Sequence, residues 1–397
     1  MTVRRHHVAL AVALLLIAVN LRLPLVSVGP VLDDVREALG LSGSAAGALT
    51  TLPVLCFAAA GAAVPALARR VGPEAALLLG MLALCAGGAL RIVPAIAPLY
   101  AGTLLAGAGI AVGNVLLPAL IKREFAPPGL MMGLYVAVMS TGAAVATALT
   151  VPLERALGSW EAALAAWTVP AVVATVAWLP ALVRARRGVP VPPLPKVRLR
   201  GDRLAWLLTG LFAFQSALFY ALATWMPDLL RDAGLSDGRA GAMVAISMQL
   251  GLPGGLLAPI IAGRVTDQRV LAAGAAGLWA AGIAGVLVWP TTLTALWMAL
   301  MGIAQGAGFA LALALVVLRS PDGARATALS GMVQSLGYVV AAAAPLALGA
   351  LHDLTGGWDA VLVAMLALSA AMLACGLGAG RPGTVGGRVD PAPQRAS

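Results

Sequence analysis

The sequence predicts an all-α integral membrane protein with twelve transmembrane helices in two six-helix bundles. Of its 397 residues, 61% are hydrophobic and only 11% are charged, whereas soluble domains carry about 25% charged residues. Apolar runs of about 20 residues, long enough to cross a bilayer core about 30 Å thick, recur along the chain. The two halves of the chain also repeat each other. These observations exclude a soluble globular domain, a disordered chain and an outer-membrane barrel with its alternating strands.

Twelve spans are expected from the apolar runs that charges, proline or glycine delimit. The first six lie at 8–31, 45–67, 75–93, 98–120, 130–152 and 161–181, and the second six at 204–226, 240–262, 271–290, 293–318, 325–350 and 360–379. Between the two sets, 183–203 is basic and rich in proline, as a solvated linker would be. The predicted organisation is an amino-terminal bundle at 1–182, this cytoplasmic linker, a carboxyl-terminal bundle at 204–380 and a disordered cytoplasmic tail at 381–397.

The first span begins like a signal peptide, because a basic stretch at 4–7 precedes the apolar run at 8–19. No soluble segment follows it, so we expect an uncleaved first helix with a cytoplasmic amino terminus.

The positions of the 26 basic residues agree with this orientation. With a cytoplasmic amino terminus, 20 of them lie on the cytoplasmic side and Arg22 lies within a span, as the positive-inside rule predicts. The five expected in outer loops are Arg36, Arg91, Arg155, Arg231 and Arg239. We therefore expect a multi-pass protein of the inner (plasma) membrane with both termini in the cytoplasm. The net charge of +10 then reflects topology and anionic lipid, and no nucleic-acid partner is expected.

The two halves share sequence at a constant spacing. The segment 40–48 recurs at 234–242 with six identities in nine positions, at an offset of 194. Six spans separate the copies, so both halves have the same orientation in the membrane. This pattern is typical of a parallel repeat about an axis along the membrane normal, with two bundles flanking a central cavity.

The loop after the second span, at 67–72, resembles the Gly-x-Leu-Ala-Asp-Arg-x-Gly motif of the major facilitator superfamily. Pro65 and Arg69 stand where Gly and Asp are usual, whereas the corresponding loop of the second half, at 263–267, keeps an acid. The resemblance covers essentially the whole chain and implies the major facilitator fold. It also implies a cytoplasmic gate latched by charged groups, and the residues that match are Arg69, Arg70, Arg264 and Asp267.

Several shorter motifs resemble the cyanate and 2-nitroimidazole transporter family within that superfamily. They are Asn20-Leu21-Arg22, Gly113-Asn114-Val115-Leu116-Leu117-Pro118, Gln215-Ser216-x-x-Phe219-Tyr220 and Trp225-Met226-Pro227. In this chain Leu23 separates the first motif from Pro24, where the family pattern has proline directly after the arginine. The resemblance implies transport of a small solute, often anionic or nitro-bearing.

Arg22 is the basic residue that falls inside a span. Counted from Val8, it lies about 21 Å into the bilayer core. In one interpretation the helix ends here and the side chain snorkels to the headgroups, but residues 23–32 are almost wholly apolar. In the other, Arg22 faces the cavity and binds an anionic or nitro group, because an intramembrane arginine needs a partner and no Asp or Glu is expected deep in a span. Pro24 is expected to break the helix beside it.

Other polar residues in the spans are either solute ligands or groups that hydrogen-bond neighbouring helices together. Besides Arg22, the predicted solute-binding residues are Asn20, Asn114, Gln215, Tyr220, Trp225, Gln305, Gln334 and Tyr338; Tyr135 and Gln249 are further polar residues in spans. Asn20, Gln215 and Tyr220 are favoured, since the resemblance implies that the first and seventh spans border the cavity. Trp225 either closes the outer end of the cavity or anchors its helix at the membrane interface.

The predicted function is secondary active transport of a small anionic or nitro-bearing solute, cyanate-like or nitroimidazole-like, by rocker-switch alternating access. The alternative is proton-coupled efflux of a lipophilic drug or metabolite, which commonly uses a membrane carboxylate. The sequence contains no ATPase motif and no catalytic or metal-binding constellation, so no enzyme activity, cofactor or metal is expected. The expected partners are the solute, the lipid bilayer and, as coupling ion, the proton. The protein is expected to be a monomer.

Overall fold

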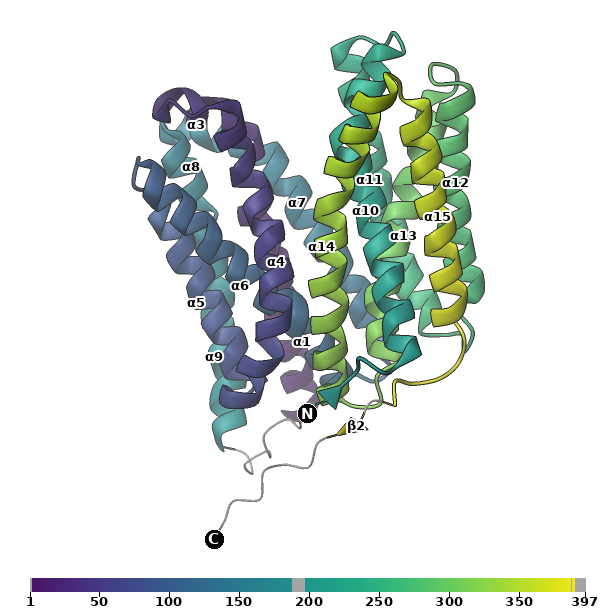
Figure 1. The fold of residues 1–397 in the computed structure, drawn as a ribbon. Coiled ribbons are helices and arrows are strands. Elements are labelled where there is room, and N and C mark those ends of the chain that lie inside the picture. Colours follow the sequence, from purple (N-terminus) through teal and green to yellow (C-terminus); the bar gives the residue numbers. More distant parts are fainter. Residues whose placement is uncertain (1, 188–196, 387, 390–397) are drawn as a thin grey trace. The chain divides into compact units, whose positions relative to one another are not determined.

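The computed structural model describes residues 2–187, 197–386, 388 and 389, without the side chains of some residues before 63. In this part of the chain, eleven helices are long and apolar enough to cross a membrane, or twelve if the bent pair Leu52–Ala59 and Ala63–Val71 forms one span. The predicted all-helical membrane protein is thereby confirmed (Figure 1). The chain divides into two compact units, which we call unit 1 (1–124, 134–198 and 388–397) and unit 2 (125–133 and 199–387).

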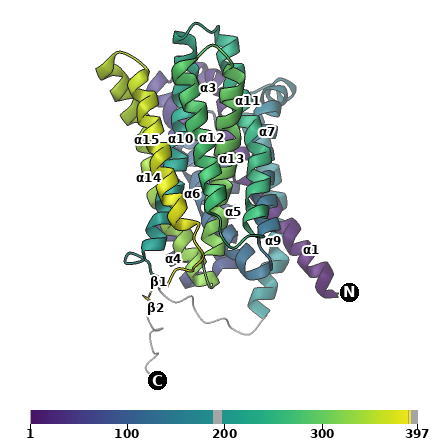
Figure 2. The same ribbon diagram turned by 90° about the vertical axis from the view of Figure 1, so that its right-hand side faces the viewer.

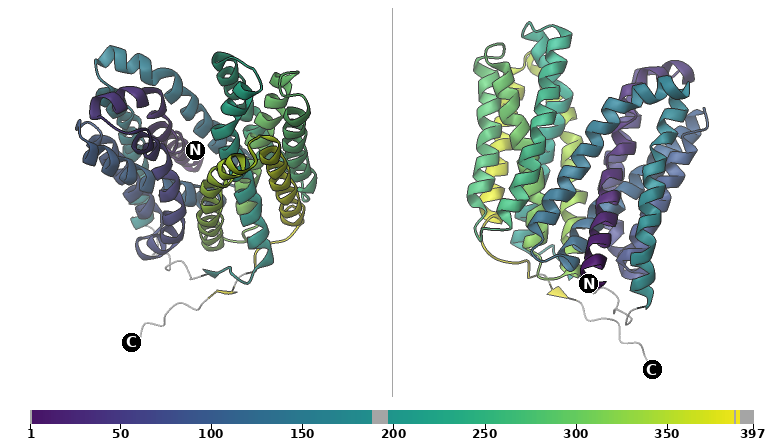
Figure 3. Two further views of the ribbon diagram at one scale, coloured as in Figure 1. Left: turned by 45° about the horizontal axis from the view of Figure 1, so that its top comes forward. Right: turned by 180° about the vertical axis from the view of Figure 1, so that it is seen from behind.

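Unit 1 contains the amino-terminal helices. They are α1 (Thr2–Asn20), α2 (Leu23–Val26), the 3-10 turn η1 (Gly29–Val31), α3 (Leu32–Leu39), α4 (Gly43–Val71), α5 (Pro73–Leu90), α6 (Ile96–Glu124), most of α7 (Gly129–Leu157), α8 (Trp160–Ala166) and α9 (Thr168–Arg187). Within this unit α6 packs on α4 and α5, and α9 packs on α1 and α5 (Figure 3). Most helices extend several residues beyond the predicted spans, as α4 does at both ends.

Glycines bring α5 and α6 into backbone contact. A Cβ atom at Gly87 would lie 2.5 Å from the carbonyl oxygen of Gly102, and one at Gly109 would collide with the carbonyl oxygen of Gly80. The sequence pattern at 107–109 predicts close helix packing of this kind, and the structure confirms it. Because no side chain separates the two helices, they form a tight pair within unit 1.

Short helices cover one end of unit 1. The chain turns after α3 at Gly40, whose φ of 60° favours glycine. Apolar side chains of α3 and α8, including Val35, Trp160 and Leu164, form one buried cluster with Leu49 and Leu99. Neither α3 nor α8 was expected as a separate helix: α3 follows the predicted first span, which ends at 31, and carries four charged residues, whereas α8 lies almost wholly within the predicted span 161–181. Burial of these side chains closes the end of the bundle.

Unit 2 contains α10 (Arg203–Asp232), α11 (Asp237–Ala262), α12 (Arg269–Val288), α13 (Thr294–Leu318), α14 (Gly323–Thr355) and α15 (Asp359–Ala379). Within this unit α13 packs on α11 and α12, while α10 packs on α14 and α15 (Figure 2). Two of these helices begin with a carboxylate cap: Asp202 accepts bonds from the amides of Leu204 and Ala205, and Asp322 accepts one from that of Arg325. The six predicted spans of this half are thus each found as one helix.

In unit 2 the closest backbone contact joins α11 and α13. A Cβ atom at Gly306 would collide with the carbonyl oxygen of Gly251, and one at Gly254 would lie 2.6 Å from that of Ile303. The fourth helix of each repeat, α6 or α13, therefore contacts a different neighbour most closely: α5 in unit 1 and α11 in unit 2.

Two short strands join the segments that flank unit 2. Strand β1 (Val197–Arg198) pairs antiparallel with β2 (Arg388–Val389), and Val197 is opposite Val389. Just before β2, Val385 is buried and its amide donates to the carbonyl of Arg319, 2.8 Å away. The prediction of a disordered tail at 381–397 therefore needs correction for the described residues 381–386, 388 and 389, because backbone hydrogen bonds fix this stretch. The remaining tail positions lie outside the described residues.

Candidate solute site

The first span is broken at Arg22. α1 ends at Asn20, and the amides of Leu21 and Arg22 close the last turn with the carbonyls of Ala18 and Val19. α2 then begins at Leu23, with Arg22 as its N-cap residue and Pro24 in its first turn. Proline has no amide hydrogen to donate to the preceding turn, so Pro24 ends α1 here. The predicted break is confirmed, and it places a half-buried arginine at the junction of two helices.

Polar atoms without hydrogen-bond partners lie buried in this part of unit 1. Among the described residues, the carboxamide oxygen of Asn20 and the hydroxyls of Ser27, Tyr135 and Thr168 have none. The charge of Arg22 acts on the Tyr135 phenol. Leaving a buried polar atom unpaired costs about 1–3 kcal/mol. A polar solute or water that reached one of these atoms would therefore be stabilised by it.

Asn20 also connects helices. Its side-chain amide donates to the carbonyl of Leu16 at 2.7 Å and to that of Pro170 on α9 at 3.2 Å. Asn114, on α6, is 8% exposed, and its neighbour Gly113 faces the break, since a Cβ atom there would lie 2.5 Å from Cδ2 of Leu21. Asn20 therefore lies at the break beside Arg22, and Asn114 follows the glycine of α6 that packs against Leu21.

Arg91 directly follows α5, in the turn before α6, but its side chain does not face solvent. Its side chain is buried, with 2% of the residue exposed, at the end of α5. Its Nη1 donates to the carbonyl oxygen of Pro24 at 2.7 Å. The sequence position of Arg91, just after an apolar run, does not reveal that a carbonyl of the broken first span lies within reach.

In unit 2 the predicted solute-binding residues Gln215 and Gln305 form hydrogen bonds between helices. Gln215 donates from Nε2 to the backbone carbonyl of Gln305 at 3.0 Å, and its Oε1 accepts the indole N–H of Trp279 at 2.9 Å. Gln305 in turn donates to the carbonyl of Ser247 at 3.2 Å. This network joins α10, α11, α12 and α13. Both polar ends of the Gln215 amide are used within the protein, which matches the interhelical interpretation of this residue.

The aromatic residues of the predicted set also have partners in unit 2. The Tyr338 ring meets Phe212 edge-on, with ring centroids 5.2 Å apart, and the Tyr220 ring packs against Phe219. The Trp225 indole donates to the carbonyl of Pro345 at 2.8 Å. Gln334 donates to the hydroxyl of Ser330, also at 2.8 Å. Of these residues Tyr220 and Trp225 are half-buried, while Gln334 and Tyr338 are buried.

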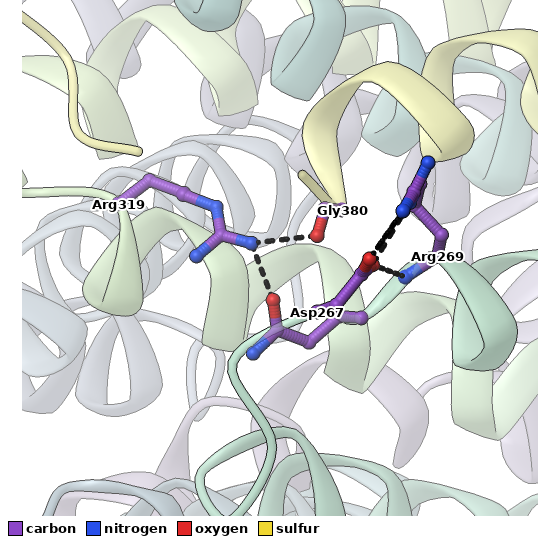
Figure 4. Close-up of polar contacts among 5 residues, drawn as sticks. Asp267, Arg269, Arg319 and Gly380 are labelled. Carbon is purple, nitrogen blue, oxygen red and sulfur yellow. Dashed lines mark hydrogen bonds and ion pairs between the residues drawn. The ribbon is translucent and has the colours of Figure 1, made fainter. Parts of the chain in front are cut away.

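The loop between α11 and α12 carries the predicted gate residue Asp267. The side chain of Arg269 donates to both carboxylate oxygens of Asp267, and these bonds hold the pKa of Asp267 down at about 2 (Figure 4). Beside this pair, buried Arg319 donates to the Gln268 side chain and to the backbone carbonyls of Ala379 and Gly380. Burial lowers the pKa of Arg319. Arg264 is exposed, and Arg69 and Arg70 end α4.

Sequence reasoning missed Arg319, Gln268 and the corresponding pair of unit 1, in which Arg123 on α6 binds Glu74 at the start of α5. The repeat could have indicated both contacts, because Arg123 and Arg319 each lie at the end of the fourth helix of their repeat. An arginine at this position reaches the loop that follows the second helix.

The fold and these sites define an integral membrane transport protein, and comparison with known proteins identifies its family. The model of the Major Facilitator Superfamily matches residues 8–341. The chain belongs to this superfamily, whose members are transport proteins and not enzymes.

Three relatives match nearly their whole length. An "Uncharacterized transporter YycB" of Bacillus subtilis (strain 168) is 40% identical over 94% of this chain and 93% of its own. The "2-nitroimidazole transporter" of Escherichia coli (strain K12) is 36% identical over 95% and 96%, respectively. The "Cyanate transport protein CynX" of the same organism is 32% identical over 87% and 90%.

Among solved structures, the fucose:proton symporter FucP of E. coli has a TM-score of 0.72 at 13% identity, with 93% of this chain and 98% of that one covered. The proton:xylose symporter XylE has a TM-score of 0.71 at 12% identity, with 94% and 95% covered. These two similarities show the major facilitator fold.

Proposed function

We propose that the protein is a secondary active transporter of a small anionic or nitro-bearing solute, and that Arg22 is its principal ligand. The observation that supports this is a half-buried arginine at the break of the first span, beside buried polar atoms without partners. A guanidinium group donates charge-assisted hydrogen bonds to anionic oxygens and suits planar groups such as nitro. The names of two relatives, a 2-nitroimidazole transporter and a cyanate transport protein, support the same class of solute.

The Tyr135 hydroxyl is the second donor in this proposal. It is buried, has no hydrogen-bond partner among the described residues and lies within the electrostatic influence of Arg22. Asn20 joins the end of α1 to α9, and Asn114 on α6 is retained as a candidate ligand. From unit 2 we retain Tyr220, Gln334 and Tyr338 as candidates, whereas Gln215, Gln305 and Trp225 are engaged in holding helices together.

Binding and flux measurements on Arg22 variants test the proposal. Purified protein is titrated with cyanate and with 2-nitroimidazole, and uptake into proteoliposomes is measured with the same probes. We expect Arg22→Ala to weaken binding at least about 100-fold and Arg22→Lys to weaken it about tenfold, since lysine keeps the charge but not the planar pair of donors. Arg239→Ala, at an exposed position in unit 2, is the matched control and should bind as the wild type does.

Retention of wild-type affinity by both Arg22 variants would contradict the proposal and leave Arg22 a structural residue. Binding of neither probe by the wild type would contradict the solute class.

The proposed mechanism is alternating access, with the two bundles at 1–182 and 204–380 rocking about a site in the membrane midplane. We propose the proton as coupling ion, a monomer as the working form, and a place in the inner membrane with both termini in the cytoplasm. An imposed pH gradient across proteoliposomes tests the coupling, because flux that ignores the gradient would exclude it. The same result would exclude the alternative function, proton-coupled efflux of a lipophilic compound.

A further inference from the structure

We propose that Arg91 is a positioning residue of the solute site: through its hydrogen bond to the Pro24 carbonyl it fixes the turn from which the Arg22 side chain projects. This inference rests on the proposed function for the role of Arg22. Arg91 itself is not proposed to touch the solute.

The short helix α2, which contains the Pro24 carbonyl bound by Arg91, is too short to be stable on its own. α2 has only four residues, and a helix of this length is not stable on its own, because forming the first turn fixes several residues for one hydrogen bond. Within it, the Arg22 carbonyl accepts from the amides of Leu25 and Val26 at 3.2 and 3.0 Å. The bond from Arg91 to Pro24 thus ties this turn to the end of α5.

The bond joins separate parts of unit 1. Pro24 and Arg91 are 67 residues apart, and the bond between Arg91 Nη1 and the Pro24 oxygen is 2.7 Å long. α6 leaves room for the side chain, since Gly102 faces it and a Cβ atom there would lie 3.1 Å from Cγ of Arg91. The Arg91 side chain therefore passes Gly102 of α6 and connects the end of α5 to the broken span.

A purely structural role would not require a guanidinium. Burying a charged group is costly, and an apolar side chain of similar volume often gives equal or better stability. No described carboxylate pairs with Arg91, and its Nε has no hydrogen-bond partner. Arg91 is thus a buried cation whose described hydrogen-bond partner is the Pro24 carbonyl of the broken segment.

The first experiment measures the coupling between Arg91 and Arg22. Binding of cyanate and of 2-nitroimidazole is measured for Arg91→Met, Arg22→Lys and the double variant. We expect Arg91→Met to raise Kd about tenfold. In the double variant the two effects should not multiply, because Arg91 acts through Arg22. Arg91→Lys, which keeps the charge and one donor, should restore part of the affinity. Wild-type Kd in Arg91→Met, or effects that multiply in the double variant, would overturn the proposal.

The second experiment does not depend on any solute. In a background with Cys56→Ala, Cys85→Ala and Cys375→Ala, Arg22→Cys is labelled with a neutral methanethiosulfonate reagent, with and without Arg91→Met. We expect the labelling rate at position 22 to change at least about threefold when Arg91 is replaced. An unchanged rate would overturn the positioning role even if Arg22 binds solute. If neither probe binds but the rate changes, the proposed function fails and the positioning role stands.

Discussion

Several buried polar groups of unit 1 are charged or lack a partner among the described residues, whereas in unit 2 the buried Gln215 amide is engaged at both ends. In unit 1, Arg91 is buried and the Tyr135 hydroxyl and the Asn20 carboxamide oxygen have no partner among the described residues. In unit 2, Gln215 uses both ends of its amide, and the buried hydroxyls of Ser216 and Ser247 have no partner among the described residues. From this contrast we expect polar residues to serve the solute in unit 1 and helix packing in unit 2.

The largest loss of stability is expected at the glycines that bring helix backbones into contact, a feature that both units share. Gly306→Ala in unit 2 and Gly109→Ala in unit 1 each force a methyl group against a backbone carbonyl of the adjacent helix. Because backbone cannot move aside as a side chain can, each should destabilise the protein by about 3 kcal/mol or more. Gly274→Ala, where a Cβ atom meets nothing within 4 Å, is the control. Thermal unfolding in detergent measures the stability of all three variants. Wild-type stability of Gly306→Ala or Gly109→Ala would contradict the backbone contact at that glycine.

Gln215→Leu addresses the network of unit 2. It leaves the Trp279 indole N–H and the Gln305 carbonyl without their partners, so we expect a loss of about 2–4 kcal/mol in stability. Variant protein that remains folded should bind cyanate and 2-nitroimidazole within about twofold of the wild type. A large loss of affinity at unchanged unfolding temperature would reverse the comparison and place Gln215 in the solute site.

Tyr135→Phe should give the opposite result. It removes a buried hydroxyl that has no partner, so stability should stay constant or rise by about 1 kcal/mol. Solute affinity should fall about fivefold, since one donor to the anionic or nitro group is lost. Thermal unfolding and titration of the same sample separate the two quantities. Unchanged affinity would remove Tyr135 from the site.

The smallest effect is expected at Asp267. Its pKa is lowered to about 2 by Arg269, so this pair stabilises the folded state above the ordinary carboxyl pKa of about 3.9 and loses that effect as pH falls toward 2. Between pH 5 and 8 the carboxylate does not titrate. Asp267→Asn should therefore leave the pH profile of transport between pH 5 and 8 unchanged in shape, with little change in unfolding temperature, because the pair is exposed. A shifted profile would show that Asp267 exchanges protons during transport.

Much of the fold was predictable because bilayer thickness dictates the length of each apolar run. The break at Arg22 was predictable too, since proline cannot donate its hydrogen bond. The role of Arg91 was not, because its partner carbonyl is 67 residues away and only packing brings the two together. Gln215 shows the same limit: its engagement depends on Trp279, on another helix. A sequence shows which polar groups enter the membrane, but only tertiary contacts show which of them are already satisfied.

The β1–β2 pair has a consequence for how this chain can be rearranged. Because residues 197–198 pair with 388–389, the segments entering and leaving unit 2 run side by side, and the amide of Gly386 donates to the carboxylate of Asp202 at 2.8 Å. A module whose two ends meet can be transplanted between scaffolds, permuted or expressed as a separate fragment without rerouting the polypeptide. The four paired residues thus join the two ends of the stretch 199–387, and an exchange of this stretch would also have to match 125–133, which belongs to the same unit.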